Sequence, residues 1–376
     1  MLNVLSYIHP VRTYLPCTGV GRHINNIVLG LHLKEDIDLN LLCSQQYLQK
    51  DGKLHTRSPL RDIPLKTFPT PENSTERNWK LFGFPSVDKY IPDGTDWLYA
   101  PLETYLPVSK CPVAVTIHDI QAFETDLPWS NTLEHKLFRY KWAWWVKRAL
   151  SDCRVVFTVS EFSKQRMVDL LGADPRKLVV SGNGVDRAFF DIALVDPMSL
   201  ARPTTDPYIF SLGGLRSKKG ADYILKVASQ LLKLRSEFKI VVAGDSELVY
   251  VNSVKDFPNI ILLGMIPDKD LPVLMRGASS LLFLSLYEGF GIPALEAMAA
   301  GIPTVVADRA SLPEIVGTAG IVVAPEETAI IVDTLIQLQE NLQLREDYIQ
   351  RGWEHSQQYT WSRCVDIVQK TLYEYA

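Results

Sequence analysis

The stretch YEGFGIPALEAMAAGIPTVVAD, residues 287–308, decides the fold of this chain. A glycine-rich turn opens the stretch, and Pro293 suits the first turn of a helix that we expect over 292–300. Apolar runs at 281–284 and 304–307 flank this helix and are typical of buried strands. Strand, helix and strand in this order predict a parallel sheet that is covered by helices on both faces.

The same alternation runs along the whole chain. It pauses over 187–206, where prolines, aspartates and a lack of periodicity indicate an interdomain linker. The sequence therefore predicts an α/β protein with one domain over 1–186, a second over 207–360 and a terminal helix over 361–376. The expected strands lie at 4–8, 39–43, 97–99, 113–117, 155–159, 178–180, 208–212, 239–243, 260–263, 281–284, 304–307 and 321–323.

Length and composition are those of a folded globular protein. The 376 residues suit two domains, and 47% hydrophobic with 22% charged residues excludes a disordered or collagen-like chain. The net charge of −4 is a poor match to nucleic acid, so no nucleic-acid partner is expected. Because no run of about 18 apolar residues could span a bilayer and no basic signal-peptide start is present, we expect a cytoplasmic protein.

The cysteines are odd in number, far apart and without the C-x-x-C pair of a metal site or a redox motif. They are Cys17, Cys43, Cys111, Cys153 and Cys364. A reducing compartment suits them best.

Two glycines follow the first expected strand. Gly19 and Gly21 precede a helical stretch, and backbone N–H groups at a helix start can bind phosphate. A nicotinamide fingerprint is not matched, because Ile24 takes the place of its third glycine and ten residues separate Ile8 from Gly19. A loop-to-helix turn without a ligand is the alternative.

His118 directly follows the expected strand at 113–117. Open α/β sheets bind ligands at the carboxyl ends of their strands, which favours a catalytic role. A histidine with a purely structural hydrogen bond is the alternative.

Three cations, Arg216, Lys218 and Lys219, stand before a helix expected over 221–234. Cations normally avoid the positive end of a helix, so this cluster beside a glycine turn suits a polyanion such as a diphosphate. The spacing is not that of a P-loop, and a solvated basic turn is the alternative.

Glu288 and Glu296 bracket the glycine-rich turn of the opening stretch, with seven residues between them. Two carboxylates beside an anion-friendly helix start suit a polyhydroxylated ligand that also carries phosphate. Alternatively, Glu296 could only stabilise the helix by its interaction with the helix dipole, but this would leave the glycine-rich turn before the helix unexplained.

Taken together, these motifs resemble the retaining GT-B glycosyltransferases of family four, which are related to glycogen and sucrose-phosphate synthases. Their signature E-x7-E corresponds to Glu288–Glu296. Further blocks of the same family are HDI at 118–120, VSEFSK at 159–164, GNGVD at 182–186 and SLPEIVG at 311–317.

The resemblance implies two facing Rossmann-like domains with a central cleft. The acceptor would bind mainly on the N-terminal side and the nucleotide-sugar donor on the C-terminal side, and the helix over 361–376 would cross back to the first domain. The implied reaction moves a hexose, with retention, to a hydroxyl of a glycan or lipid-linked acceptor.

Motif position also implies individual roles. His118 and Glu288 would be catalytic residues beside the transferred sugar, and Lys219 would bind the donor diphosphate, with Lys218 or Arg216 in the place of the family's arginine. The other implied donor-binding residues are Glu296, on the ribose, and Gly19, Gly21, Met265, Ile266, Gly289, Phe290, Gly291 and Ile292, mostly through backbone atoms.

The diphosphate leaving group gains negative charge as its bond to the sugar breaks, so cations beside the phosphates lower the barrier most. A metal ion bound by a D-x-D motif is another way to stabilise the diphosphate. Asp36-Ile37-Asp38 matches this motif, but it comes before its expected strand instead of after it, so we interpret it as a turn. No metal or other cofactor is therefore expected.

The donor is predicted from likeness alone. The stretches at 19–31 and 288–320 resemble the bacterial mannosyltransferase-type branch, which indicates GDP-mannose. A UDP- or ADP-sugar is the alternative, and a catalytically silent nucleotide-sugar-binding subunit is a more remote one.

A helix expected over 133–150 could contact a membrane surface, because it combines aromatic and basic residues. The alternative is a helix that covers the first domain and buries Phe138, Trp142 and Trp145.

Overall fold

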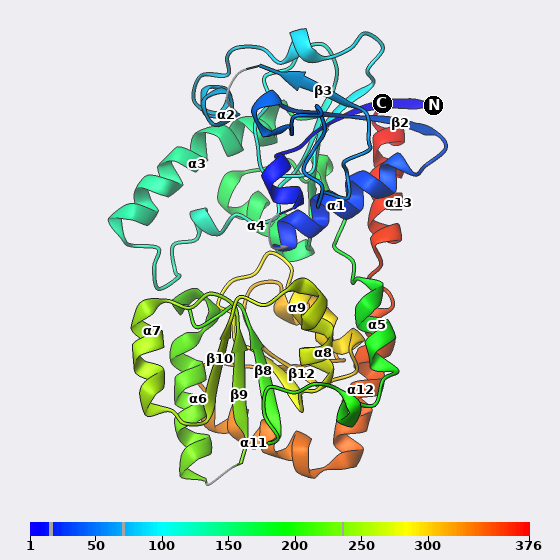
Figure 1. Cartoon of the computed structure of the whole chain (residues 1–376). Helices are drawn as coiled ribbons and strands as arrows, with labels where there is room; N and C mark the ends of the chain where they lie inside the picture. Colours follow the sequence, from blue (N-terminus) through cyan, green and yellow to red (C-terminus); the bar gives the residue numbers. More distant parts are fainter. Residues whose placement is uncertain (15–17, 70–71, 235–236) are drawn as a thin grey trace. The chain divides into compact units, whose positions relative to one another are not determined.

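A computed structural model of the chain describes residues 1–14, 18–69, 72–234 and 237–376 (Figure 1). The chain forms two compact units: unit 1 comprises Met1–Asn183 and Trp361–Ala376, and unit 2 comprises Gly184–Thr360. Each unit contains one parallel sheet with helices packed on it. The predicted α/β class is confirmed.

Unit 1 is built on a seven-stranded sheet in the order β3-β2-β1-β4-β5-β6-β7. The strands are β1 (Leu2–Tyr7), β2 (Ile37–Ser44), β3 (Leu65–Phe68), β4 (Trp97–Ala100), β5 (Val113–Thr116), β6 (Val155–Thr158) and β7 (Leu178–Val180). This is the doubly wound order, in which the chain starts at a central strand, builds one side of the sheet and then returns to build the other. Strands β4, β5 and β6 are buried along their whole length, which explains their continuous apolar sequence.

Among the described residues, four α-helices of unit 1 come from the N-terminal half of the chain and one comes from its C-terminus. They are α1 (Gly19–His32), α2 (Glu72–Phe82), α3 (Leu133–Asp152), α4 (Glu161–Leu171) and α13 (Trp361–Glu374). Helix α13 packs along α1 and buries Val368 and Leu372 (Figure 1). Trp97 Nε1, on β4, donates a hydrogen bond to the Leu372 carbonyl at 2.9 Å. The C-terminal helix is thus part of the core of unit 1.

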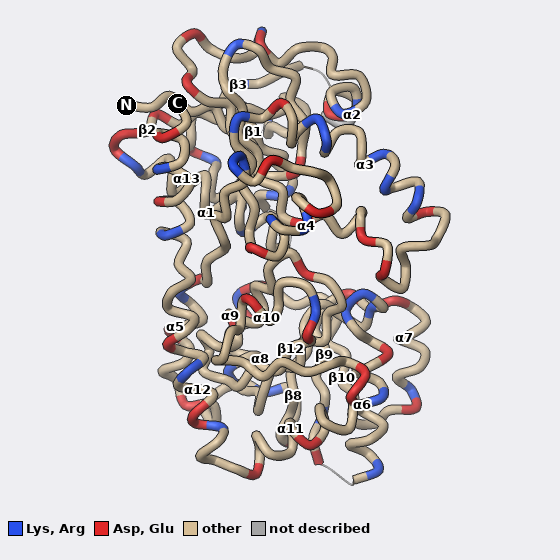
Figure 2. Tube along the Cα trace, turned by 180° about the vertical axis from the view of Figure 1, so that it is seen from behind, with Lys and Arg blue, Asp and Glu red and all other residues tan. Residues whose placement is uncertain are grey.

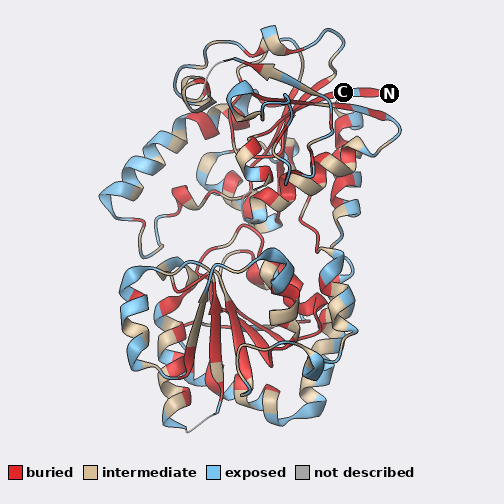
Figure 3. Cartoon of the chain, in the orientation of Figure 1, coloured by how far each residue is buried: buried red, intermediate tan, exposed pale blue. Residues whose placement is uncertain are grey.

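Unit 2 has a six-stranded sheet in the order β10-β9-β8-β11-β12-β13, the Rossmann order again. Its strands are β8 (Tyr208–Leu212), β9 (Lys239–Ala243), β10 (Ile260–Gly264), β11 (Ser280–Phe283), β12 (Thr304–Ala307) and β13 (Ile321–Val323). Its helices are α5 (Arg187–Ala193), α6 (Ala221–Lys233), α7 (Leu248–Ser253), α8 (Leu271–Arg276), α9 (Ile292–Ala299), α10 (Leu312–Val316), α11 (Thr328–Glu340) and α12 (Leu342–Ser356). Figure 3 shows the central strands mostly buried and the helices exposed on the faces that point away from the sheet, while the edge strands β10 and β13 each have only one buried residue.

Every expected strand is present, with ends that differ by at most two residues. The patterning did not predict β3, because Leu65, Lys66 and Thr67 are only partly buried or exposed at the edge of the sheet. The expected linker at 187–206 belongs to unit 2 and begins with α5, which packs against α8 and α9. Seven residues are too few to show a helical period, but Phe189 is buried.

Two further observations concern membrane-spanning helices and disulfides. No helix in the described ranges is both long and apolar enough to cross a membrane. Cys17 lies outside the described residues, and Cys43, Cys111, Cys153 and Cys364 are not joined to one another by disulfides.

Candidate active site

Unit 2 places two loops at the point where its strand order reverses. Strands β8 and β11 are neighbours, although three helices and two strands separate them in the chain. The β8 loop (213–220) and the β11 loop (284–291) therefore leave the same edge of the sheet side by side. In open α/β sheets this edge, beside the reversal of strand order, is where ligands bind.

Backbone hydrogen bonds hold the two loops together. The Lys218 carbonyl accepts from Leu286 N at 3.0 Å and from the Ser285 hydroxyl at 3.3 Å. Gly220, which starts α6, has φ +76°, and a Cβ there would lie 2.2 Å from the Leu284 carbonyl oxygen. Only glycine allows α6 to begin so close to the end of β11.

Lys219 and Glu288 meet between the loops. Lys219 Nζ lies 2.5 Å from Glu288 Oε1, and the two side chains are only 23% and 18% exposed. The stem of Lys219 lies along Gly213, where a Cβ would come within 3.2 Å of it. This ion pair holds a positive and a negative group in fixed positions in a partly buried place. A bound diphosphate could replace Glu288 as the partner of Lys219, and a sugar hydroxyl could replace Lys219 as the partner of Glu288.

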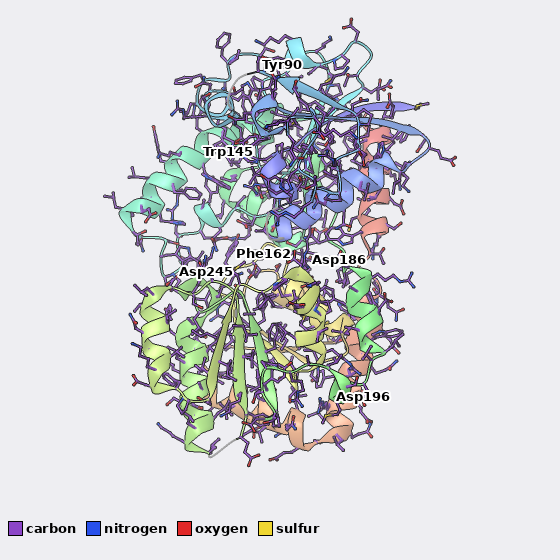
Figure 4. All side chains as sticks on the ribbon, in the orientation of Figure 1. Tyr90, Trp145, Phe162, Asp186, Asp196 and Asp245 are labelled. Atoms are coloured by element: carbon purple, nitrogen blue, oxygen red, sulfur yellow. The ribbon has the colours of Figure 1, made fainter. Side chains whose placement is uncertain are left out.

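The other two predicted cations differ from Lys219 in their surroundings. Arg216 donates from Nε to the Asp245 carbonyl at 2.9 Å and pairs through Nη2 with the Asp245 carboxylate (Asp245 is labelled in Figure 4). Lys218 is exposed. The ion pair with Asp245 thus directs Arg216 toward the end of β9, while Lys218 extends into solvent.

The β11 loop leads into α9 through Gly291, which has φ +105° and no side-chain cap. A Cβ at Gly291 would lie 2.6 Å from Leu312 Cδ2, so another residue would push the loop away from α10. The Ser311 hydroxyl lies 2.9 Å from the Glu288 carbonyl and 2.8 Å from the Phe290 carbonyl. These contacts fix the loop and leave the start of α9 available to an anion.

Unit 1 has its own cluster at the corresponding edge of its sheet. His118 follows β5, and its Nδ1 lies 2.7 Å from Oε1 of Glu103, which follows β4. Arg12, which follows β1, places Nη1 3.9 Å from Glu103 Oε2. Three neighbouring strands therefore contribute one residue each to a charged group, in which His118 and Glu103 are largely covered and Arg12 is exposed.

Helix α1 adds a second histidine. The His23 ring lies 4.7 Å from the His118 ring, and its Nδ1 lies 2.9 Å from Asn183 Oδ1. Burial, together with the charge of His118, lowers the pKa of His23 to about 3, so this side chain is neutral at ordinary pH. A Cβ at Gly21 would lie 2.6 Å from the Arg12 carbonyl oxygen, so close packing of α1 is sufficient to require this glycine.

Two family models match the chain. The model described as Glycosyltransferase Family 4 matches residues 18–189, and the one described as Glycosyl transferases group 1 matches residues 196–355. The chain belongs to the family-four glycosyltransferases. The predicted family is therefore confirmed.

Individual relatives agree with this assignment. O-antigen chain mannosyltransferase B of Escherichia coli is 26% identical over 370 residues, which cover 93% of this chain and 94% of that protein. Sucrose-phosphate synthase from Thermosynechococcus elongatus has the same fold, with a TM-score of 0.73 and 15% identity over the full length of both chains. Anabaena Alr3699/HepE, solved in complex with UDP-glucose, has a TM-score of 0.68 and 16% identity, again over both full chains.

The glycosyltransferase has predicted site residues in both units. In unit 2, Lys219 meets Glu288, and Gly289, Phe290, Gly291, Ile292 and Glu296 follow in the β11 loop and α9, whereas Arg216 pairs with Asp245 and Lys218 extends into solvent. Glu296 is buried within α9, and Met265 and Ile266 lie on the loop after β10, where Met265 is exposed. In unit 1, Gly19 and Gly21 lie in the first turn of α1 and His118 follows β5.

Sequence reasoning missed Glu103, Arg12 and His23 in the glycosyltransferase. Glu103 comes three residues after β4, so the strand-end rule that selected His118 could have found it. His23 and Asn183 lie inside the quoted stretches at 19–31 and 182–186, but nothing in the sequence places them beside His118.

Within the described part of the glycosyltransferase, no group of three or more His, Cys, Asp or Glu side chains could hold a metal ion. Asp36 precedes β2 and accepts a hydrogen bond from Gln369 Nε2, on α13, at 2.7 Å. This contact gives Asp36 a structural role in tying α13 to unit 1.

Proposed function

We propose that this glycosyltransferase moves mannose from GDP-mannose, with retention of configuration, to a hydroxyl of a glycan or lipid-linked acceptor. The observation that carries the proposal is the Lys219–Glu288 pair between the β8 and β11 loops, beside the start of α9. The mannose donor is supported by the relative named as an O-antigen chain mannosyltransferase. UDP- and ADP-sugars are the alternative donors, and a silent nucleotide-sugar-binding subunit is a more remote alternative.

The proposed mechanism follows from charge. When the bond between the anomeric carbon and the diphosphate breaks, the leaving oxygen becomes negative and the sugar becomes oxocarbenium-like. The Lys219 ammonium group and the backbone N–H groups at the start of α9 would stabilise the diphosphate, while Glu288 would bind the sugar. Because both loops are fixed before the donor arrives, little reorganisation is needed in the transition state.

Calorimetric titration tests the donor. A pocket that hydrogen-bonds one sugar hydroxyl rejects analogues that lack it, because its buried polar groups are left unpaired. GDP-mannose should therefore bind more tightly than UDP-glucose, UDP-N-acetylglucosamine and ADP-glucose. A clear preference for a UDP- or ADP-sugar would contradict the mannose assignment and leave the glycosyltransferase family unaffected.

We also propose that the reaction needs no metal, since Lys219 of the β8 loop and the backbone N–H groups at the start of α9 would stabilise the diphosphate. Slow cleavage of GDP-mannose in EDTA, followed by proton NMR, tests this together with retention. The first sugar released should be the α-anomer, at a rate unchanged by EDTA. A β-anomer would contradict retention, and a rate lost in EDTA and restored by Mg²⁺ or Mn²⁺ would contradict the metal-free reaction.

Helix α3 has an exposed outer face that could bind a membrane surface. Its inner face buries Trp145 and partly buries Trp142, whereas Phe138 is 44% exposed, so only one of the three expected aromatics is fully covered. Its outer face carries Leu133, Leu137, Tyr140 and Trp144, all exposed and spaced so that they form one stripe. Figure 3 shows how much of α3 is exposed, and Figure 4 labels Trp145 on the inner side.

Cations border this apolar stripe on both sides. At 100° per residue, Lys136 and Lys147 fall on one side of it and Lys141 and Arg148 on the other. Figure 2 shows Lys and Arg distributed along the helix. With five Lys and Arg against two Asp and Glu, α3 carries a charge of +3 in a chain of net charge −4. Such a helix suits the surface of an anionic bilayer, and we propose peripheral binding there.

Vesicle sedimentation tests this location. The protein should bind vesicles that contain phosphatidylglycerol more strongly than pure phosphatidylcholine vesicles. The triple variant Leu137→Ser, Tyr140→Ser, Trp144→Ser should lose at least tenfold in binding. A matched control, Leu194→Ser, Met198→Ser, Leu248→Ser, replaces three exposed apolar residues of unit 2 and should bind normally. Equal binding to both vesicle types, or equal losses in both triple variants, would contradict the proposal.

A further inference from the structure

We infer that Glu103 is a positioning residue for His118: it holds the imidazole through Nδ1 and so leaves Nε2 directed to the substrate. The inference rests on the proposed function and on the place beside the transferred sugar that the family resemblance implies for His118. It adds a role for a carboxylate that belongs to none of the sequence motifs.

One carboxylate oxygen makes both contacts to His118. Oε1 of Glu103 lies 2.7 Å from His118 Nδ1 and accepts from the His118 backbone N–H at 3.2 Å. The side chains of His118 and Glu103 are only 8% and 12% exposed. Two contacts from the same buried atom fix both the position of the residue and the rotation of its ring.

The charge of Glu103 determines which nitrogen of His118 carries hydrogen. Burial would raise the pKa of Glu103, but the charge of His118, their hydrogen bond and the Arg12 guanidinium outweigh it and lower this pKa to about 2. An ionised carboxylate can only accept hydrogen bonds, so His118 must donate from Nδ1. In the neutral ring Nε2 is then an acceptor for a hydroxyl group, and in the charged ring it is a donor.

The other neighbours of His118 support its ring without engaging Nε2. The His23 ring stands at 84° to the His118 ring, with 4.7 Å between their centres, and is fully buried. The Ser163 hydroxyl, on α4, donates to the His118 carbonyl at 3.3 Å. Among the residues that the structure describes, Nε2 of His118 is buried and has no hydrogen-bond partner.

The test compares Glu103→Gln with Glu124→Gln. Both variants remove the charge of a carboxylate in unit 1 whose side chain is 12% (Glu103) or 10% (Glu124) exposed, but Glu124 pairs with Arg166 and does not contact His118 in the interactions described. A glutamine at 103 can accept or donate, so it no longer dictates the tautomer. We expect Glu103→Gln to lower kcat at least tenfold with the donor KM within about twofold, whereas Glu124→Gln should keep the kcat of the original protein.

Nitrogen-15 NMR of labelled histidine provides a readout that does not depend on turnover. His118, assigned with a His118→Asn variant, should carry hydrogen on Nδ1 in the original protein and in Glu124→Gln. In Glu103→Gln its signals should shift toward a mixture of tautomers. An unchanged tautomer in Glu103→Gln, or an equal loss of kcat in both variants, would overturn the positioning role. A changed tautomer in a protein that cleaves no nucleotide sugar would overturn the proposed function instead.

Discussion

The Lys219 ammonium group is paired with the Glu288 carboxylate, with 2.5 Å between Nζ and Oε1. A bound diphosphate would take over the lysine as its own partner. Replacing Lys219 with Ala removes a group that interacts most strongly with the developing charge of the leaving diphosphate. We expect kcat/KM to fall by more than about tenfold, or about 1.4 kcal/mol, and donor affinity to fall by less. Steady-state kinetics measure the first quantity and calorimetry the second.

The control for this substitution is Lys226→Ala, on the exposed side of α6. It removes the same charge from the same unit without touching the β8 or β11 loop and should leave kcat/KM unchanged. A loss below tenfold for Lys219→Ala, or a similar loss in both variants, would show that Lys219 is an ordinary surface cation.

His23 makes stability depend on pH. Its pKa is near 3 in the folded protein, chiefly because of burial, and about 6.5 in the unfolded chain, so below pH 6.5 only the unfolded chain gains a proton. The free energy of unfolding should therefore decrease as the pH falls, by about 2 kcal/mol from this residue between pH 7.5 and pH 5.0.

Urea unfolding of the original protein and of His23→Gln at both pH values isolates this contribution. Burial also lowers the pKa of His9 and His135, but their effects are common to both proteins and cancel in the comparison. The variant should lose about 2 kcal/mol less than the original protein. Equal losses would mean that His23 is protonated in the folded state.

The sequence predicted some of these residues better than others. Lys219 and Glu288 could be found because each lies in a glycine-rich loop directly after an expected strand. Glu103 could not be assigned to His118, since 15 positions separate them and only the pairing of β4 with β5 brings them together. His23 occupies the apolar side of α1, where its partner Asn183 is 160 positions away.

At the scale of elements, the contact between α1 and α13 is unusually close. A Cβ at Gly30 would lie 2.4 Å from Cγ2 of Val365 and 3.3 Å from its Cβ. Alanine improves helix propensity by up to about 1 kcal/mol over glycine, but overpacking costs about 1–3 kcal/mol. We therefore expect Gly30→Ala to destabilise the protein by about 1–2 kcal/mol in denaturant unfolding.

A double-mutant cycle separates the clash from other effects. In a Val365→Ala background the added Cβ has room, so Gly30→Ala should become neutral or stabilising there. If Gly30→Ala costs the same in both backgrounds, α13 does not pack on α1 as described.

Buried strands were the elements that sequence patterning predicted well. Continuous apolar runs such as 155–158 are unambiguous, because both faces of a parallel sheet are covered. Strand β3 lies at the sheet edge and only Phe68 of its four residues is buried, and α5 is held by the packing of Phe189 instead of by a periodic pattern. Both depend on tertiary contacts that a local pattern does not contain.

At the scale of the whole molecule, both units repeat the doubly wound strand order, and each gathers polar residues where that order reverses. The family could be predicted because its motifs extend from 118 to 317. The identity of the donor base could not, since the expected contacts at Met265 and Ile266 use backbone atoms that every residue carries.

The most direct test of the central claim is amide hydrogen exchange with and without the nucleotide sugar that titrates most tightly. The bound donor should protect the backbone N–H groups of 213–220, the β8 loop, and of 288–296, the second half of the β11 loop with the first part of α9. The same protection should be weaker in Lys219→Ala at equal donor concentration. Binding of the donor without protection of either segment would contradict the placement of the diphosphate between these loops.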